Sequence, residues 1–331
     1  MKPGWRLALL ALAALVAGVA ALGIGGAALP LDAVARALVH PRAGGAVGAI
    51  VWQLRLPRIV IADIVGATLA LAGFLLQGLL RNPLVDPYLT GVSAGTGAAV
   101  AIGVTVGVGA ALVPVLGFGA GLATALIVAA LARRGAGLDV ERLILAGISL
   151  SAFFSAIVVL VLTRSGPGAA QAIIAWLAGS LDGRGWPDVI ATLPYAFVGV
   201  ALAAVAAPTL NALRLGRTTA GTLGVDLVRA QWLLLAAASL LTSVAVALGG
   251  LIGFVGLIVP HLARRIVGSD ARVALPAVVL IGGIVMPLAD AASRALLAPS
   301  EIPLSVLLAF IGVPAFLYLY SRPEARRLWG T

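Results

Sequence analysis

The chain has 331 residues, of which 62% are hydrophobic and only 10% are charged, and its mean hydropathy is +1.14. A soluble domain carries about 25% charged residues, so this composition excludes a water-exposed globular surface and indicates that lipid surrounds most of the chain. The formal net charge is +10, but the arginines form short clusters between apolar runs, which does not indicate nucleic-acid binding. The absence of Cys excludes disulfides and thiolate metal sites.

The apolar runs predict an all-α, polytopic membrane protein with about ten transmembrane helices in a single domain, residues 1–331. A helix needs about 20 apolar residues to cross a bilayer. The first run follows a basic start but is longer than a usual signal core, so we interpret it as a retained span. The predicted spans are 5–27, 58–80, 91–112, 114–132, 142–163, 188–208, 231–249, 251–267, 274–296 and 304–321. The stretch "GGLIGFVG" at 249–256 leaves open whether the chain makes a tight turn there or breaks inside one long helix.

The basic residues predict the orientation. With the N-terminus inside, 15 of the 22 basic residues fall in inner segments and seven in outer ones, as the positive-inside rule requires. The outer seven are Arg36, Arg42, Arg55, Arg58, Arg164, Arg184 and Arg294. Both termini are therefore predicted to be cytoplasmic, with 28–57 and 164–187 as outer loops that have room for short surface helices.

The stretch "RNPLVDPYLTGVSAGTGAAVA" at 81–101 interrupts the apolar pattern. Pro83 lacks an N–H and disfavours helix at Asn82, so the second span ends near Leu80, and Asp86-Pro87 blocks a second start. The residues that follow are almost all small, which lets helix backbones approach closely. The same small residues suit the wall of an aqueous path, so both interpretations stay open.

At this stretch a resemblance becomes clear. "LRLPRIV", "GATLALAGFLLQGLLRNPLVDPYLTGVSAGTGAA" and "GGLIGFVGLIVPHLARRIVGSDARVALP" resemble the permease subunit of bacterial ABC importers for iron chelates, haem and cobalamin, over about residues 50–320. The resemblance implies a type II importer permease fold. It implies a homodimer with the path along the dimer interface, two cytoplasmic ATPase subunits, a periplasmic substrate-binding protein, and a multi-pass location in the bacterial inner membrane.

The energy source can be read from the lysines. A P-loop needs a Lys to reach the nucleotide phosphates, and the only Lys is Lys2, outside any Gly-rich context. The chain is therefore not expected to be an enzyme, and a partner must hydrolyse the ATP. No cofactor is predicted. As substrate we expect haem or another iron chelate rather than cobalamin. This expectation rests on how common importers for each substrate are, and no residue of the sequence supports it.

A secondary carrier without an ATPase is the alternative class. Such a carrier usually places carboxylates deep in its spans, and the candidates here are Asp63 and Asp290. Asp63 lies about five residues into its span, roughly 8 Å from the outer end. Asp290 lies four residues before Arg294, at the spacing of a helical ion pair. Both can be paired near the outer face, which counts against the carrier. A membrane enzyme would need a nucleophile or metal cluster inside the spans, and we find none in the sequence.

Arg55, Arg58 and Arg294 are predicted at the outer mouth, against the positive-inside bias. Arginine suits carboxylates on a docking protein, and anchoring to lipid phosphate is the alternative. The resemblance favours docking, because these arginines match family positions that meet acidic residues of the binding protein.

The inner loop 209–230, "NALRLGRTTAGTLGVDLVRA" over most of its length, is predicted to form two short helical pieces punctuated by Gly216, Gly221 and Gly224, with Thr218 or Thr219 as N-cap. An interfacial helix on lipid is the alternative. The resemblance implies that this loop is the cytoplasmic segment that couples to the ATPase. The coupling residues are predicted to be Arg217, Thr218, Thr219, Ala220, Gly221, Leu223, Gly224 and Val225.

Two further sets complete the candidate site. The pathway lining is predicted to comprise Thr90, Gly91, Ser93, Ala94, Gly95, Gly97, Phe153 and Phe154. The histidines His40 and His261 fall on opposite sides of the membrane, so no pair can hold one iron, and no metal site is predicted.

Overall fold

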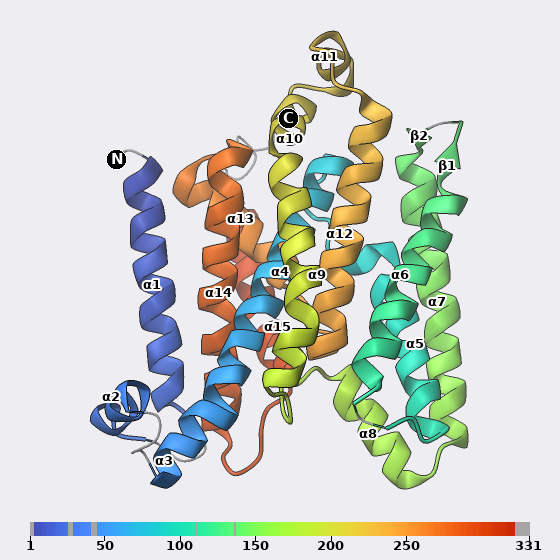
Figure 1. Cartoon of the computed structure of the whole chain (residues 1–331). Coiled ribbons are helices and arrows are strands. Elements are labelled where there is room, and N and C mark those ends of the chain that lie inside the picture. The colour runs from blue at the N-terminus through green and yellow to red at the C-terminus, as the bar shows by residue number, and fades with distance from the viewer. Residues whose placement is uncertain (1–2, 26–28, 41–44, 110, 136, 322–331) are drawn as a thin grey trace.

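The computed structural model describes residues 3–25, 29–40, 45–109, 111–135 and 137–321, and these form a bundle of helices with one small hairpin (Figure 1). Lys2, Arg42, Arg322, Arg326 and Arg327, which contribute to the predicted orientation, and the C-terminus itself lie outside the described residues. The helices are α1 (Pro3–Gly23), α2 (Leu31–Val39), α3 (Gly45–Ala49), α4 (Leu56–Leu80), α5 (Val92–Thr105), α6 (Val113–Leu131), α7 (Val140–Arg164), α8 (Pro167–Leu177), α9 (Trp186–Val205), α10 (Ala207–Arg214), α11 (Arg217–Thr222), α12 (Leu227–Gly249), α13 (Val255–Val267), α14 (Ala271–Leu296) and α15 (Leu304–Ser321). The hairpin pairs β1 (Arg133–Arg134) with β2 (Gly137–Leu138).

Among the described residues, seven helices are long and apolar enough to cross a membrane, so the chain is a multi-pass membrane protein. They are Gly4–Gly23, Gly45–Leu80, Val113–Leu131, Val140–Arg164, Trp186–Val205, Leu227–Gly249 and Ala271–Leu296. The other three predicted spans correspond to the shorter helices α5, α13 and α15, so the count of ten stays a prediction. α5 has 14 residues instead of the expected 22, because the chain turns after it at Gly107, whose φ is +80°.

The predicted start of the second span is wrong. The helix runs on from Gly45 through a π-helical turn, Ile50–Arg55, into α4, so it begins 13 residues before residue 58. Pro57 has no N–H, so it cannot donate the hydrogen bond that a helical residue normally gives to a carbonyl one turn earlier. A π-helical turn is one way for the helix to continue despite this missing bond. The expected surface helices in the two long loops are confirmed as α2 and α8.

The core is formed where α4 packs against its neighbours backbone to backbone. A Cβ placed on Gly73 of α4 would lie 1.9 Å from the carbonyl oxygen of Gly256 in α13. A Cβ on Gly66 would lie 2.3 Å from the carbonyl oxygen of Gly282 in α14. Since small residues permit such approach in lipid, glycine is required at these crossings, and α4 is held at the centre of the bundle.

The predicted end of the second span is confirmed, and at 249–256 the chain makes the tight turn, not a break inside one helix. α4 ends at Leu80, and Arg81 takes a left-handed conformation with φ +51°. The carboxylate of Asp86 then accepts a hydrogen bond from the N–H of Tyr88 at 2.9 Å and caps the 3₁₀ turn Pro87–Thr90. At the second break α12 and α13 are separate helices. Arg6 of α1 donates to the carbonyl of Ile266 at 2.6 Å, so α13 ends beside the start of α1 and runs back toward the end of the bundle where α12 began (Figure 1).

The loops gather at two opposite ends (Figure 1). The start of α1, the β1–β2 hairpin, α10 and α11 lie at one end, here called the α11 end. α2, α3 and α8 lie at the other, the α2 end. This grouping is the one expected from the alternation of inner and outer segments, and the assignment of the α11 end to the cytoplasm stays a prediction.

Candidate functional site

At the α2 end, the predicted docking arginines meet around one buried carboxylate. Asp290 of α14 is about 1% exposed in its side chain. It accepts from Arg58 Nη2 at 2.9 Å and from Arg294 Nε at 3.0 Å. The predicted Asp290–Arg294 pair one helical turn apart is therefore confirmed. Arg58 also forms a fork with Glu301, Nη1 to Oε1 at 3.0 Å and Nη2 to Oε2 at 2.7 Å.

Arg55 and Arg294 are buried, 8% and 9% exposed, and hold the end of α1. Arg55 Nη1 donates to the carbonyl of Leu22 at 2.5 Å, and Arg294 Nη1 donates to that of Ile24 at 3.0 Å. The last carbonyls of a helix have no donor within the helix and carry partial negative charge, so a guanidinium there is stabilising. Gly25 makes room for both side chains, since a Cβ on it would lie 2.7 Å from Arg294 Nη1 and 3.2 Å from Arg55 Nη2.

Water reaches this cluster only at its rim. The side chain of Arg58 is 11% exposed, that of Glu301 is 34% exposed, and that of Asp182, 3.6 Å from Arg58 Nη1, is 79% exposed. A carboxylate arriving from outside could take the place of Glu301 on the Arg58 fork, whereas Arg55 and Arg294 lie behind it. The docking role of the three arginines stays a prediction.

At the α11 end, the predicted inner loop forms two short helices, α10 and α11, which confirms the two expected helical pieces. Gly216, with φ +109°, is the N-cap of α11, so the expected Thr218 or Thr219 cap is wrong. Gly221 lies inside α11, and α12 follows, capped by the Asp226 carboxylate. Most predicted coupling residues are exposed, namely Thr218, Thr219, Gly221, Leu223 and Gly224, while Val225 is half-buried and Ala220 is buried. α11 therefore exposes most of its surface, and its buried Ala220 packs against the rest of the chain.

α10 ties this segment to the core helix α14. Asn211 Nδ2 donates to the Asp270 carboxylate at 2.7 Å, and Asn211 Oδ1 accepts from the N–H of Ala271 at 2.7 Å. Arg214 of α10 donates to the carbonyl of Ser269. The Asn211 amide, with help from the N–H of Arg272, lowers the pKa of Asp270 below its usual value. The carboxylate stays charged at neutral pH and holds α10 to the start of α14.

The small residues predicted to line a pathway pack inside the chain. Thr90, Gly91, Ser93, Gly95 and Gly97 are buried and Ala94 is half-buried. A Cβ on Gly95 would lie 1.9 Å from Thr124 Oγ1 of α6 and 3.2 Å from Phe154 of α7, so α5 uses small residues for close packing. Phe153 is 62% exposed on α7 and contacts Phe154 edge to face, with ring centroids 5.7 Å apart.

The remaining titratable candidates lie apart from one another. His40 follows α2, and His261 lies in α13. No group of three or more His, Cys, Asp or Glu able to hold a metal is found in the described part of the chain. Of the two carboxylates expected to be paired, only Asp290 is: Asp63 has no hydrogen-bond or ion-pair partner among the described residues, and its Oδ1 lies 3.3 Å from where a Cβ on Gly283 would stand.

Sequence reasoning missed the acids and the amide that complete these sites. Glu301 and Asp182 are far from Arg58 in sequence, and Asn211 is 60 residues from Ala271. The one available signal was that charged residues are rare in this chain, so each acid near a predicted outer end was a candidate partner for an outer arginine.

A multi-pass bundle of helices, with a buried arginine–carboxylate cluster at one end and an exposed short helix at the other, places the chain among polytopic helical membrane proteins. The chain belongs to the FecCD transport family, whose model matches residues 12–322, which confirms the resemblance noted from the sequence.

It is 42% identical over 281 residues to the cobalamin import system permease protein BtuC of Halobacterium salinarum, covering 84% of this chain and 75% of that one. It is 36% identical over 286 residues to the hemin transport system permease protein HmuU of Yersinia pestis, covering 84% and 85%. A solved structure described as an inward-facing conformation of a metal-chelate type ABC transporter superposes with a TM-score of 0.86 at 33% identity, covering 95% of this chain and 98% of that one.

Proposed function

We propose that this chain is the permease subunit of an ATP-driven importer in the inner membrane. It takes haem or another iron chelate from a periplasmic binding protein and releases it to the cytoplasm. The observation that carries the proposal is the superposition with a metal-chelate type ABC transporter, which spans nearly all of both chains. Because the only Lys is Lys2, power comes from two cytoplasmic ATPase subunits.

Cobalamin is the second candidate substrate. The identity to the cobalamin permease, 42%, exceeds that to the hemin permease, 36%. Asp290 is held between two arginines and is not available to carry a proton or an ion, so a secondary carrier would have to use Asp63 alone.

The two ends of the bundle suit the two protein partners. We assign the rim of Arg58, Glu301 and Asp182 to the binding protein, with Arg55 and Arg294 holding Arg58's neighbours in place. The exposed face of α11 is assigned to the ATPase, and Asn211 and Asp270 carry its displacement to α14 as a rigid-body movement.

A second copy of the chain completes the path. In the apolar stretch of α7, only 6% of the residues are buried inside the chain, whereas 83% are buried in the corresponding stretch of Gly45–Leu80. We propose that α7 faces the second copy and that Phe153 and Phe154 line the path between the two, with the small residues of α5 packed behind them.

Reconstitution tests this function. Vesicles holding this chain, its ATPase and its binding protein should accumulate haem or a ferric chelate only when ATP is supplied, and cobalamin should be offered in parallel. Vesicles with this chain alone should accumulate nothing under a proton gradient. Uphill uptake by the chain alone would overturn the proposal in favour of a carrier.

A further inference from the structure

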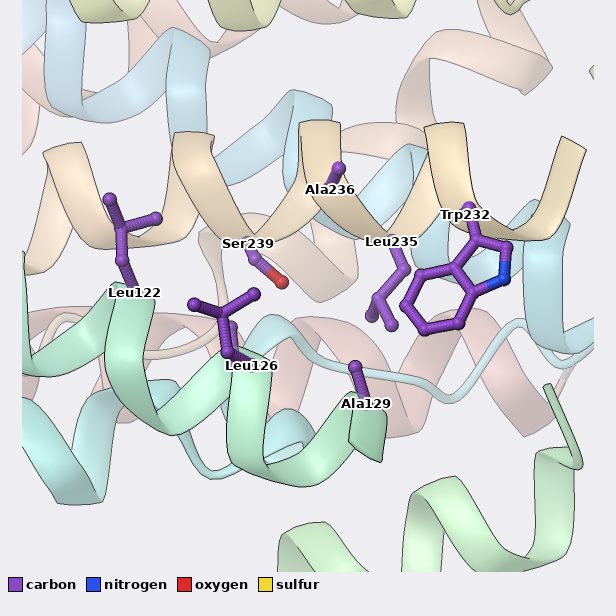
Figure 2. A pocket seen from close by; sticks show the side chains of 8 residues that line it. Leu122, Leu126, Ala129, Trp232, Leu235, Ala236 and Ser239 are labelled. Carbon is purple, nitrogen blue, oxygen red and sulfur yellow. The ribbon is translucent and has the colours of Figure 1, made fainter. Parts of the chain in front are cut away.

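A cavity of about 240 Å³ lies between α6 and α12, outside the sites described above (Figure 2). Its lining is Leu122, Ala125, Leu126 and Ala129 from α6 with Trp232, Leu235, Ala236 and Ser239 from α12. Leu126 is 71% exposed and Ala236 is exposed, so the cavity is a groove that opens on the outside of the bundle. Both helices are candidate spans, and the groove therefore opens toward hydrocarbon.

The groove has two distinct ends. Leu122 and Ser239 lie at one end, and Ala129 and Trp232 at the other (Figure 2). Seven residues on each helix separate the ends, about 10 Å at 1.5 Å per residue. The alanines leave the space that larger side chains would fill, and the Ser239 hydroxyl is buried without a hydrogen bond among the described residues. The rest of the lining is apolar, which suits a hydrocarbon chain.

Basic residues stand beyond the Trp232 end. α6 ends at Leu131, and Arg133 and Arg134 follow at once in β1. The hairpin is fixed to α12 beside Trp232, because Gln231 Oε1 accepts from the N–H of Leu138 at 2.9 Å and Gln231 Nε2 donates to its carbonyl at 3.1 Å. Arg133 and Arg134 therefore follow the end of α6, four and five residues after Ala129, at the edge of the apolar span.

The charge at this end is net positive. Arg134 pairs with the half-buried Asp139 at 3.3 Å, and Arg229 pairs with the exposed Asp226 at 3.0 Å. Both arginines are exposed, and ion pairs at a water-facing surface contribute little. Arg133 is exposed, and its Nε donates to the carbonyl of Gly135 at 3.1 Å. With Glu141 and Arg142, both exposed at the start of α7, four arginines stand beside three carboxylates, and an anion would be attracted here.

We propose that the α6–α12 groove binds an acyl chain of an anionic phospholipid from the leaflet at the α11 end, with the phosphate beside Arg133 and Arg134. Tryptophan is enriched at the membrane interface, and basic groups at the end of a span attract anionic headgroups. Trp232 therefore marks the level between tail and headgroup. This site is independent of the proposed transport function.

Native mass spectrometry of the full chain in detergent tests the headgroup part. Phosphatidylglycerol should bind about 25-fold more tightly than phosphatidylcholine with the same acyl chains, on the order of fivefold for each of the two arginines. The double variant Arg133→Gln with Arg134→Gln should remove this preference. Arg36→Gln, an exposed and paired arginine at the α2 end, is the matched control and should keep it. Equal binding of the two lipids by the parent chain would overturn the proposal.

The tail part has its own variants. Ala236→Phe should fill the groove and weaken both lipids by tenfold or more, while Ala130→Phe, at an exposed α6 position outside the lining, should not. Unchanged phosphatidylglycerol binding in Ala236→Phe would place the lipid elsewhere. Because the chain has no Cys, Ala236→Cys also reports another occupant: a disulfide-linked dimer in native membranes would show that a second copy covers the groove, and the proposal would then be wrong.

Discussion

At the scale of single residues, Asp290 decides the character of the α2 end. Two guanidinium groups share a carboxylate that is about 1% exposed. Removing one partner of a buried pair is strongly destabilising, whereas an exposed pair contributes little. The cluster is therefore a fixed structural unit, and only the Arg58–Glu301 fork at its rim is placed to exchange partners.

Glu301→Gln tests that exchange. If a carboxylate of the binding protein competes with Glu301 for Arg58, removing the charge of Glu301 should tighten capture of the binding protein several-fold at low salt, because a hydrogen bond between charged groups is stronger than one to a neutral amide. The dissociation constant can be measured by passing each permease variant over binding protein that is immobilised on a surface.

The matched control is Asp32→Asn, which removes an exposed acid at the same end, in α2, from an exposed pair with Arg36. It should leave capture within about twofold. Weaker capture by Glu301→Gln would mean that Glu301 itself contacts the partner as an ordered group, and the exchange interpretation would have to be dropped.

At the scale of helices, the sequence predicts where elements stop better than how they continue. Pro83 and Asp86-Pro87 act on their own backbone, so the end of α4 at Leu80 could be read locally. The extension of that helix back to Gly45 could not, because Pro57 is tolerated through a π-helical turn that no local pattern announces.

The same limit applies to the small residues of α5. A run of Gly, Ser, Ala and Thr is compatible with a pore wall and with close packing, and only the partners distinguish the two. Gly95 faces Thr124 and Phe154, and Gly91 faces the carbonyl of Gly147, which shows packing within the chain. The Arg294–Asp290 pair could be predicted because both residues lie in one helix. The Arg58–Glu301 pair could not, because only the tertiary fold brings these two residues together.

The link between α10 and α14 yields a prediction at this scale that rests on the proposed function. Asn211→Ala should lower the substrate moved per ATP hydrolysed several-fold while assembly and ATP turnover persist. Its two hydrogen bonds join the coupling segment to a core helix. The bond to the N–H of Ala271 contributes about 1 kcal/mol to stability and the bond to the charged Asp270 about 1.5–3 kcal/mol. Uptake and phosphate release measured on the same vesicles give the ratio.

Thr192→Ala, in α9 and away from the coupling segment, is the control for this change. The Thr192 hydroxyl donates within its own helix, to the carbonyls of Asp188 at 2.6 Å and Val189 at 3.4 Å, so its loss should leave the ratio unchanged. A normal ratio in Asn211→Ala would show that α11 acts on the spans through α12 alone.

At the scale of the whole molecule, the two ends differ in what they present. The α2 end carries a buried ionic cluster with an acidic rim of Glu301 and Asp182. The α11 end carries exposed arginines of the hairpin and of α12, and a helix whose small side chains leave its backbone accessible. The positive-inside rule predicts that the α11 end lies in the cytoplasm, where both the proposed ATPase and anionic lipid would contact it.

Sidedness can be measured directly because the chain has no Cys to report from elsewhere. Single cysteines at Ala35 in α2 and Thr218 in α11, both exposed positions, should react differently with a membrane-impermeant maleimide added to intact cells stripped of the outer membrane. Ala35→Cys should be labelled at once, and Thr218→Cys only after permeabilisation. Ala220→Cys, at a fully buried position of α11, should stay unlabelled in both cases and so separates burial from sidedness. Immediate labelling of Thr218→Cys would put α11 outside, where no ATPase could reach it, and the importer assignment would fail with the orientation.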